Sequence, residues 1–258
     1  MERKKITVIK VGGKIVEEQE SLDALLDRFA AIEGAKVLIH GGGRSATKTA
    51  ERLGIESKMV NGRRITDKDM LQVVTMVYGG LVNKNIVASL QARGINALGL
   101  TGADCNIIRA HKRPVGEVDF GFVGDVEHAD GDMLGRLIEQ GIVPIVAPLT
   151  HDGKGNLLNT NADTMAAETA KGLAKLYDVT LTYCFEFPGV MRNPDDADSL
   201  IPVINKESYK QLLADGTVSG GMIPKIDNAF NAIDNGVAKV IITKADAIDG
   251  KSGTHIVA

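Results

Sequence analysis

The stretch Ile6-Thr-Val-Ile-Lys-Val-Gly-Gly13 decides how this chain folds. Its apolar residues are mostly β-branched, which predicts a short buried strand that runs straight into two glycines. Lys10 lies at the end of that strand, where an ammonium group is costly to bury unless an anion pairs with it. The two glycines allow a sharp turn and a close approach of backbone N–H groups to a ligand. The stretch fits either a phosphate site at the carboxyl edge of a parallel sheet or an ordinary turn beside a lysine that reaches water.

The same succession of strand, glycines and helix occurs a second time. Residues 35–39 form another predicted strand, which ends in His40-Gly-Gly-Gly43 and leads into a helix from about Arg44 to Leu53. Between the two strands, apolar residues at helical spacing from Ser21 to Ile32 predict the connecting helix. The order β-α-β-α implies a parallel sheet with right-handed crossovers.

The rest of the chain continues this alternation. A hairpin turn is expected at Asn61-Gly62, and one long helix from Thr66 or Asp67 to about Arg93, with Gly79-Gly80 as its weak point. The other expected elements are strands at 95–100, 142–146, 176–182, 237–242 and 254–257, irregular β structure over 106–127, and helices at 132–140, from about 161, at 206–213 and at 219–235. We therefore expect one large continuous α/β sheet, with an N-terminal lobe (1–180) and a C-terminal lobe (181–258) on either side of a cleft.

Composition excludes several classes of protein. Apolar residues make up 44% and charged residues 24% of the 258 residues, as in ordinary globular proteins, and the net charge of −3 argues against nucleic-acid binding through bulk basicity. Residues 1–5 lead directly into the first strand and no apolar run is long enough to cross a membrane, so we expect a cytoplasmic protein without a signal peptide. Cys105 and Cys184 lack metal-ligand spacing and are expected to be buried, reduced thiols.

The two glycine groups form the first candidate site. Gly12–Gly13 and Gly41–Gly43 end strands that should be neighbours, so both would open onto the same edge of the sheet, beside a helix N-terminus that favours anions. Neither group matches the dinucleotide fingerprint G-x-G-x-x-G or the phosphate-binding P-loop. We therefore predict a phosphate cradle of another type.

Charged residues mark three further candidates. Lys225 lies near the start of a helix that follows Gly220-Gly221, where an anionic ligand explains a cation better than the helix dipole does. Asp163 is either one of the polar residues that cap a helix or a carboxylate that orients two lysines. Arg64, beside a turn, is either a solvated charge or a bidentate ligand for a substrate carboxylate. The five histidines show no ligand spacing, so we expect no protein metal site, and a metal would arrive with a nucleotide.

The order and spacing of these motifs resemble the amino acid kinase family, in its acylglutamate branch. The matching pieces are Lys10-x-Gly-Gly13, His40-Gly-Gly-Gly43, Asn61-Gly-x-Arg-x-Thr66, Val82-Asn-Lys84, Gly99-Leu-Thr-Gly102, Gly121-Phe-Val-Gly124, Asn159-x-Asn-Ala-Asp163 and Gly220-Gly-Met-x-x-Lys225. The resemblance implies an open three-layer αβα sandwich with a mainly parallel central sheet. It also implies a homodimer whose N-terminal lobe binds the acylglutamate and dimerises, and whose C-terminal lobe binds ATP.

The resemblance further implies a reaction, in which ATP, delivered with Mg²⁺, phosphorylates the side-chain carboxylate of N-acetyl-L-glutamate in the second step of arginine biosynthesis. The catalytic residues would be Lys10 and Lys225, which stabilise the transferring phosphoryl group, and Asp163, which organises both lysines. The substrate-binding residues would be Gly42, Gly43, Arg64 and Asn159, and the nucleotide-binding residues Gly12, Gly13, Gly189, Gly220 and Gly221, with Gly12, Gly13, Gly42 and Gly43 donating N–H groups to phosphates. A side-chain carboxylate has a pKa of about 4.3 and is ionised at neutral pH, so no general base is needed.

Two departures from the family pattern leave alternatives open. Cys184-Phe-Glu-Phe-Pro-Gly189 carries Glu186 where the family has Asp, which puts the adenine and ribose contacts in doubt. The first strand begins too early for the N-terminal helix of arginine-sensitive hexamers, so we expect a dimer without that inhibition. Arg63 is either solvated or suited to an N-succinyl substrate. Glutamate 5-kinase, aspartokinase, a nucleoside monophosphate kinase and a non-catalytic ligand sensor are the competing interpretations, and retention of both lysines argues against the sensor.

Overall fold

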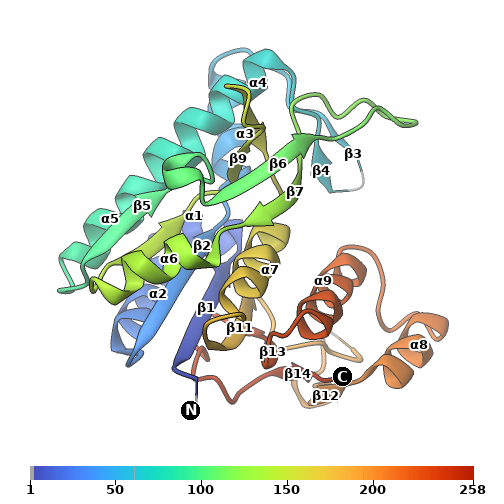
Figure 1. Ribbon diagram of the computed structural model, residues 1–258. Coiled ribbons are helices and arrows are strands. Elements are labelled where there is room, and N and C mark those ends of the chain that lie inside the picture. Colours follow the sequence, from blue (N-terminus) through green and yellow to red (C-terminus); the bar gives the residue numbers. More distant parts are fainter. Residues whose placement is uncertain (1–2, 61, 194) are drawn as a thin grey trace.

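The computed structural model describes residues 3–60, 62–193 and 195–258, and its centre is one twisted sheet of eight strands (Figure 1). Strand β1 (Lys5–Val11) lies in the middle and pairs in parallel with β2 (Ala35–His40) and β11 (Asp178–Phe185). The strands follow the order β12-β14-β13-β11-β1-β2-β8-β5, with β5 (Ala97–Leu100), β8 (Val143–Val146), β12 (Val203–Ile204), β13 (Lys239–Lys244) and β14 (Thr254–Ile256). Only β14 runs against a neighbour, β13, so the predicted, mainly parallel sheet is confirmed.

Helices cover both faces of this sheet, which confirms the three-layer αβα arrangement (Figure 1). One face packs against α1 (Gly13–Glu17), α2 (Gln19–Ala31), α3 (Gly43–Arg52), α4 (Lys68–Val74), the π-helix η1 (Thr75–Val82) and α5 (Asn83–Gln91). The other packs against α6 (Gly131–Glu139), α7 (Ala162–Leu173), α8 (Lys206–Ala214) and α9 (Met222–Asp234). Short 3₁₀ turns occur at η2 (Asp104–Asn106) and η3 (Ala197–Ser199).

The alternation of side chains along β1 decides which way Lys10 points. Ile6 and Val8 pack into the core beneath α7 and α9, whereas Ile9 and Val11 pack beneath α2 and α3. Because successive side chains of a strand point to opposite faces, Lys10 shares the face of Ile6 and Val8. The strand therefore directs the ammonium group of Lys10 toward the layer that contains α7 and α9.

A smaller four-stranded sheet lies beyond one end of the central sheet. It has the order β10-β9-β6-β7, built from β6 (Ile108–Lys112), β7 (Gly124–Ala129), β9 (Leu149–His151) and β10 (Leu157–Asn159). The pairing of β6 with β7 is irregular between Arg109 and Ala110, as expected for the glycine-rich stretch 106–127. The predicted hairpin is β3 (Met59–Val60) with β4 (Arg63–Arg64), and Asn61 at its turn lies outside the described residues.

The long helix predicted from 66 to 93 is continuous but not regular. Asp67 caps it, since its side chain accepts from the Met70 N–H at 2.8 Å, and the middle turns, from Thr75 to Val82, are π-helical. These turns contain Gly79-Gly80, the expected weak point. Single π-helical turns inside α-helices often lie at functional sites. Here the π-helical segment presents Tyr78 to the glycine loop after β2.

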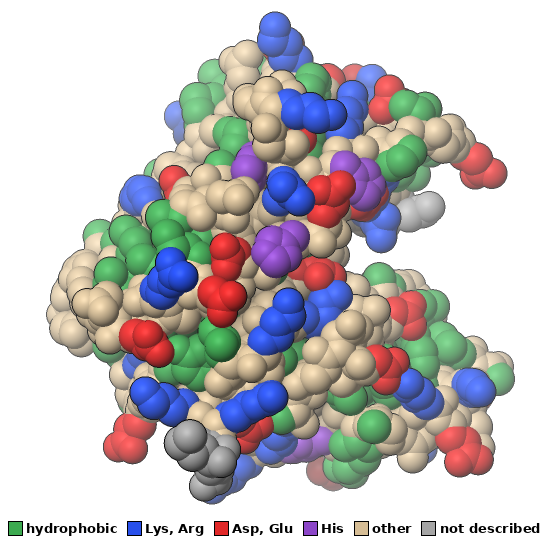
Figure 2. Space-filling view, viewed as in Figure 1, with side chains coloured by type: hydrophobic (Ala, Val, Ile, Leu, Met, Phe, Trp, Pro, Cys, Tyr) green, Lys and Arg blue, Asp and Glu red, His purple; other side chains and the backbone are tan. Residues whose placement is uncertain are grey.

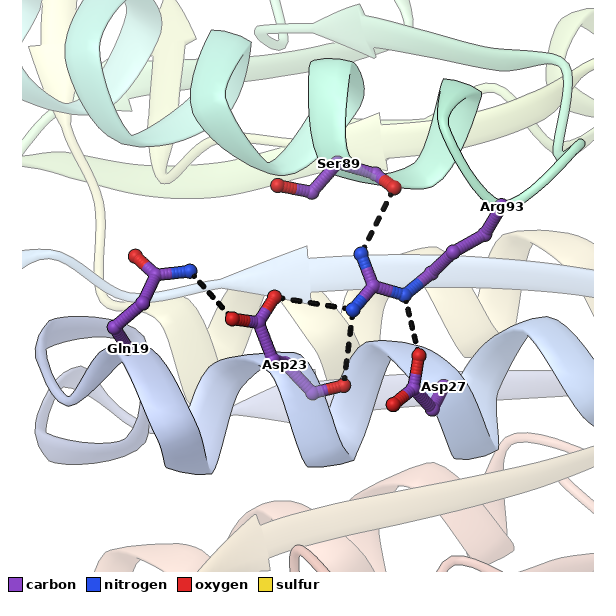
Figure 3. A network of polar contacts seen from close by, with 5 residues as sticks. All are labelled: Gln19, Asp23, Asp27, Ser89 and Arg93. Atoms are coloured by element: carbon purple, nitrogen blue, oxygen red, sulfur yellow. Dashed lines mark hydrogen bonds and ion pairs between the residues drawn. The ribbon is translucent and has the colours of Figure 1, made fainter.

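Arg93 fastens the end of this long helix to α2 (Figure 3). Its guanidinium donates from Nε to Asp27 at 2.6 Å, from Nη2 to Asp23 at 3.0 Å, and from Nη1 to the carbonyl of Ser89 at 3.0 Å. Gln19 also donates to Asp23 at 2.9 Å, and the hydrogen bonds from Gln19 and Arg93 hold the pKa of Asp23 below its usual value. Two helices from distant parts of the sequence are thus held together across the same face of the sheet.

Two expectations require correction. The helix α1 was not foreseen, because its five residues are too few to show helical periodicity. Cys105 is exposed and has a φ of +52°, so only Cys184 is the buried thiol that the sequence predicted. Both cysteines are free, and burial raises the pKa of Cys184 to about 12. The Cys184 thiol is therefore not poised as a nucleophile.

Candidate functional site

Three side chains from three elements meet at the carboxyl edge of the central sheet. Lys10 lies 2.7 Å from one carboxylate oxygen of Asp163, measured from Nζ to Oδ1. Lys225 donates from Nζ to the other oxygen, Oδ2, at 2.8 Å. Lys10 lies on β1, Asp163 in the first turn of α7 and Lys225 in the first turn of α9. Lysines 215 positions apart thus share one carboxylate.

The two interpretations of the 159–163 motif are resolved by the start of α7. Asn161 is the capping residue, because its side chain accepts from the N–H groups of Asp163 at 2.8 Å and Thr164 at 3.1 Å. The carboxylate of Asp163 is therefore free to bind the two lysines. Asp163 is held from its backbone side too, where Tyr183 on β11 donates to its carbonyl at 3.3 Å.

The charge of this cluster is not balanced. Burial alone raises the pKa of Asp163, and the charges and hydrogen bonds of Lys10 and Lys225 outweigh it and lower the pKa to about 2. The side chains of Lys10 and Asp163 are only 10% and 11% exposed, and that of Lys225 is 23% exposed. One carboxylate between two ammonium groups leaves one positive charge without a counter-ion among the residues that the structure describes. Such an arrangement favours an anionic ligand.

The two glycine groups face each other beside the lysines, as expected for neighbouring strands. A Cβ atom added at Gly13 would lie 3.8 Å from the amide nitrogen of Gly43, and one at Gly41 would lie 3.2 Å from that of Gly13. A Cβ at Gly42 would come within 2.8 Å of the ring of Tyr78. These close approaches bring backbone N–H groups from two loops to one place, which is how proteins cradle phosphate groups.

A buried polar chain supports the second glycine loop from behind. His40 donates from Nδ1 to the carbonyl of Gly41 at 2.7 Å and accepts at Nε2 from Asn83 at 3.1 Å. Lys84 donates to Asn83 at 3.1 Å and to the carbonyl of Gly99 at 3.0 Å. A side chain at Gly99 would overlap Asn83, which explains the glycine there. This chain joins two of the sequence motifs to the glycine loop.

Two adjoining cavities open at this edge, and we name them by their charged residues. The lysine cavity, of about 420 Å³, is bordered by both glycine groups and the two lysines, and it contains Lys10, Gly12, Gly13, Lys14, Arg44, Glu186 and Lys225. The arginine cavity, of about 200 Å³, contains Arg63, Arg64, Arg113, Asp125, Asn159 and Thr160. Gly41–Gly43, Met59 and Arg64 border both. Figure 2 shows the molecule hollowed between the arm that carries β3 and β4 and the part that carries α9.

Arg64 is buried rather than solvated. It is 7% exposed, and its guanidinium donates to the carbonyl of Gly43 at 2.7 Å, to Thr47 at 2.9 Å and to Ser57. Within ranges 3–60, 62–193 and 195–258, no carboxylate forms an ion pair with it. Asn159 lies on the same wall and donates to Thr66 at 2.9 Å. A buried guanidinium without an acidic partner again favours an anion in the cavity.

Three of the glycines expected at a nucleotide site border neither cavity. Gly189 packs against Thr254, whose Oγ1 would lie 2.6 Å from a Cβ at that position. Gly220 and Gly221 precede α9 and have open space beside them. Sequence reasoning missed Lys14 and Arg44, which border the lysine cavity. A signal for both was present, because each directly follows a glycine group.

No metal-binding cluster accompanies these residues. In the part of the chain that the structure describes, no group of three or more His, Cys, Asp or Glu side chains could hold a metal ion. The only carboxylate bordering the lysine cavity in that part is Glu186, which also pairs with cations.

Comparison with known proteins agrees with this geometry. A family model described as the amino acid kinase family matches residues 5–244. The chain is 67% identical over 254 residues to a protein of Bacteroides thetaiotaomicron named acetylglutamate kinase, covering 98% of this chain and 99% of that protein. A protein of the same name from Parabacteroides distasonis is 64% identical, with 98% and 99% covered.

Solved structures share the fold over the full length. The crystal structure of smu.665 from Streptococcus mutans is 28% identical with a TM-score of 0.82, and 98% of each chain is covered. Carbamate kinase from Giardia lamblia, bound to AMP-PNP, is 17% identical with a TM-score of 0.68, covering 100% of this chain and 99% of that one. At that identity the second likeness concerns the fold alone.

His40 predicts a pH dependence of stability. Burial lowers its pKa to about 4, whereas an unfolded histidine has a pKa of about 6.5. The unfolded state therefore binds a proton that the folded state refuses, and stability falls as the pH drops from 6.5 toward 4, by about 3 kcal/mol in total. The free energy of unfolding, measured with urea at several pH values in this range, should fall with decreasing pH in the wild type. In His40→Gln it should fall by about 3 kcal/mol less. An equal dependence of unfolding free energy on pH in the two proteins would contradict the low pKa of His40.

Proposed function

The chain belongs to the amino acid kinase family, and on that premise we propose that it transfers the γ-phosphoryl group of ATP to the side-chain carboxylate of N-acetyl-L-glutamate. This is the acetylglutamate kinase reaction, the second step of arginine biosynthesis. The observation that carries the proposal is the pair of lysines, one buried and one partly buried, that share one carboxylate beside a double glycine cradle. That site has a surplus of positive charge, as a reaction between two anions requires.

Lys10 and Lys225 have the roles that the reaction demands of its cations. Each ammonium group has donors to spare after binding Asp163, and both lysines border the lysine cavity. They would donate to oxygens of the phosphoryl group, where negative charge develops during transfer. Asp163 does not take a proton, because its pKa of about 2 keeps it ionised at neutral pH. It is therefore a positioning carboxylate. Its negative charge offsets the repulsion between the two ammonium groups and so keeps them side by side.

The substrate would bind in the arginine cavity. Arg64 is buried on its wall without an acidic partner among the described residues, so it suits the α-carboxylate of the amino acid. Asn159 lies on the same wall, and Gly42 and Gly43 lie where the two cavities join. A substrate held there would direct its side-chain carboxylate toward the lysine cavity. That carboxylate is already ionised at neutral pH, so the chain needs no general base.

The nucleotide phosphates would lie against Gly12, Gly13 and the two lysines. Magnesium bound to the nucleotide would neutralise part of the phosphate charge. It would arrive with ATP, because magnesium is commonly held by substrate phosphates rather than by a dedicated protein cage. The other three glycines expected at the nucleotide do not border either cavity; they are Gly189, Gly220 and Gly221. They would help to shape the loops around the site rather than donate N–H groups to the phosphates.

The alternatives are less well supported. An N-succinyl substrate would engage Arg63 with its extra carboxylate, but Arg63 is exposed at the rim of the arginine cavity and the high-identity relatives are named for the acetyl compound. A non-catalytic sensor would not need two buried lysines on one carboxylate. A coupled assay for ADP release should therefore show turnover with N-acetylglutamate that exceeds turnover with N-succinylglutamate or free glutamate.

Lys225 provides the direct test of the catalytic proposal. Replacing it in Lys225→Met should lower kcat by about 10²–10³-fold, because loss of one preorganised donor to a transition state costs roughly 3 kcal/mol. Lys171→Met is the matched control, since Lys171 is similarly buried and pairs with Glu168 at 2.7 Å away from both cavities. We expect kcat of the control to remain that of the wild type. A kcat for Lys225→Met within a few-fold of the wild type would overturn the role.

The long helix gives the argument for a homodimer. Contrary to the expectation from the sequence, helix Lys68–Gln91 is apolar and long enough to cross a membrane by length and composition, but 44% of its most apolar window is buried, as in a core helix. Its inner face packs in the core, while Met76 (54% exposed) and Leu81 (56%) lie on its outer face. Leu98 (37%) is exposed on β5, the edge strand of the central sheet. Exposed apolar residues beside an open sheet edge fit a second copy of the chain.

A charge on this face should disrupt the dimer. Sedimentation equilibrium should give twice the mass of one chain for the wild type, and Leu81→Lys should shift it toward the monomer because a lysine would be buried in the contact. Leu176→Lys serves as the control, because Leu176 is 42% exposed and lies in the turn that follows α7. A monomeric wild type, or a Leu81→Lys variant that remains dimeric, would show that the contact lies elsewhere.

A further inference from the structure

Glu186 bridges two of the cations that border the lysine cavity. Its carboxylate lies 3.3 Å from the ammonium of Lys14 and 3.8 Å from the guanidinium of Arg44. Lys14 belongs to α1, Arg44 to the first turn of α3, and Glu186 directly follows β11. The bridge therefore links the two glycine groups to the segment where the sequence departs from the family pattern.

Glu186 also differs in the sign of its charge from the other charged side chains around the lysine cavity. Five cationic side chains border the lysine cavity, and Glu186 is the only acidic side chain bordering it within the described residues. Asp163 holds Lys10 and Lys225, which we call the inner lysines, and Glu186 pairs with the two exposed cations, Lys14 and Arg44. The inner pairs are buried, whereas the side chains of Lys14, Arg44 and Glu186 are 41%, 59% and 42% exposed.

This difference in exposure makes the two groups behave differently. Water screens the outer pairs, so they contribute little to stability and rearrange easily. A polyanion that enters the cavity meets Lys14 and Arg44 at its mouth, and its oxygens compete with the carboxylate for the same donors. Glu186 would then be left beside like charges. The outer bridge thus opposes the binding of a polyanion, while the inner cluster favours it.

We propose that Glu186 is a built-in competitor of the nucleotide, a carboxylate that pairs with Lys14 and Arg44 in the empty site and yields both to phosphate oxygens. The inference rests on the proposed ATP-dependent function and adds residues that the reaction itself does not require. It separates two classes of cation. Lys10 and Lys225 serve the transferring group, and Lys14 and Arg44 set the affinity for the nucleotide.

Equilibrium binding of AMP, ADP and ATP, followed by isothermal titration calorimetry without the amino acid substrate, tests this. Glu186→Gln should bind ATP about threefold to tenfold more tightly, since removing one like charge at the surface is worth roughly that factor. Lys14→Met and Arg44→Met should each weaken ATP binding by a similar factor. The effects should be largest for ATP and smallest for AMP, and they should shrink in high salt.

A coupling measurement separates competition from a general change of charge. When Lys14 is already replaced, as in the double variant Lys14→Met/Glu186→Gln, removal of the carboxylate should increase the affinity for ATP by a smaller factor than it does in the wild-type background. Asp234→Asn is the matched control, because Asp234 is half-exposed, pairs with Lys206 at 2.7 Å at the end of α9, and lies in no cavity that Lys14 or Glu186 borders. Its affinity for ATP should equal that of the wild type.

The outcomes are distinct. Weaker or unchanged ATP binding by Glu186→Gln would overturn the inference, and weaker binding would make Glu186 a ligand of the nucleotide instead. Equal gains for AMP and ATP would overturn it as well, because the competition is with phosphate charge. If the wild-type chain binds no ATP, the proposed function is overturned. If the wild type binds ATP and Glu186→Gln binds it with the same affinity, only the competitor role is overturned.

Discussion

Two ammonium groups, those of the buried Lys10 and the partly buried Lys225, share a single carboxylate, and the site depends on that shared contact. Asp163 keeps Lys10 and Lys225 within 2.7 and 2.8 Å of its two oxygens, and without it the lysines would repel each other in a poorly hydrated place. Their surplus charge is what draws an anion to the edge of the sheet. The same surplus explains why Asp163 has a pKa of about 2 despite its burial.

The fold supplies this contact by simple geometric rules. Alternation along β1 directs Lys10 to the face on which α7 and α9 pack, and the first turns of both helices end beside it. Asn161 takes over the capping of α7 and so releases Asp163 for the lysines. On the opposite face, Tyr78 in the π-helical turns and His40 at the end of β2 support the glycine loop. Binding groups thus come from both faces of one sheet and meet at its edge.

Much of this could be predicted from the sequence, and the reasons differ between elements. Strands and glycine loops are encoded locally, so β1, β2 and their glycines were predicted to be neighbours, and the structure confirms it. The convergence of Lys10, Asp163 and Lys225 has no local signal, and the family resemblance supplied it. The sequence could not show that Arg64 is buried, because burial depends on Thr47 and Ser57 around it. The π-helical turns and the bridge of Glu186 with Lys14 and Arg44 also arise from tertiary packing rather than from local sequence.

The central claim is that both ammonium groups act on one phosphoryl group. A crystal structure of the chain with ADP, aluminium fluoride and N-acetylglutamate tests it most directly, because the fluoride takes the place of the group in transfer. We expect the Nζ atoms of Lys10 and Lys225 both to lie within hydrogen-bonding distance, about 2.7–3.2 Å, of the fluoride ligands while Asp163 still contacts each lysine. Fluoride bound away from either lysine, or contacted by only one of them, would contradict it.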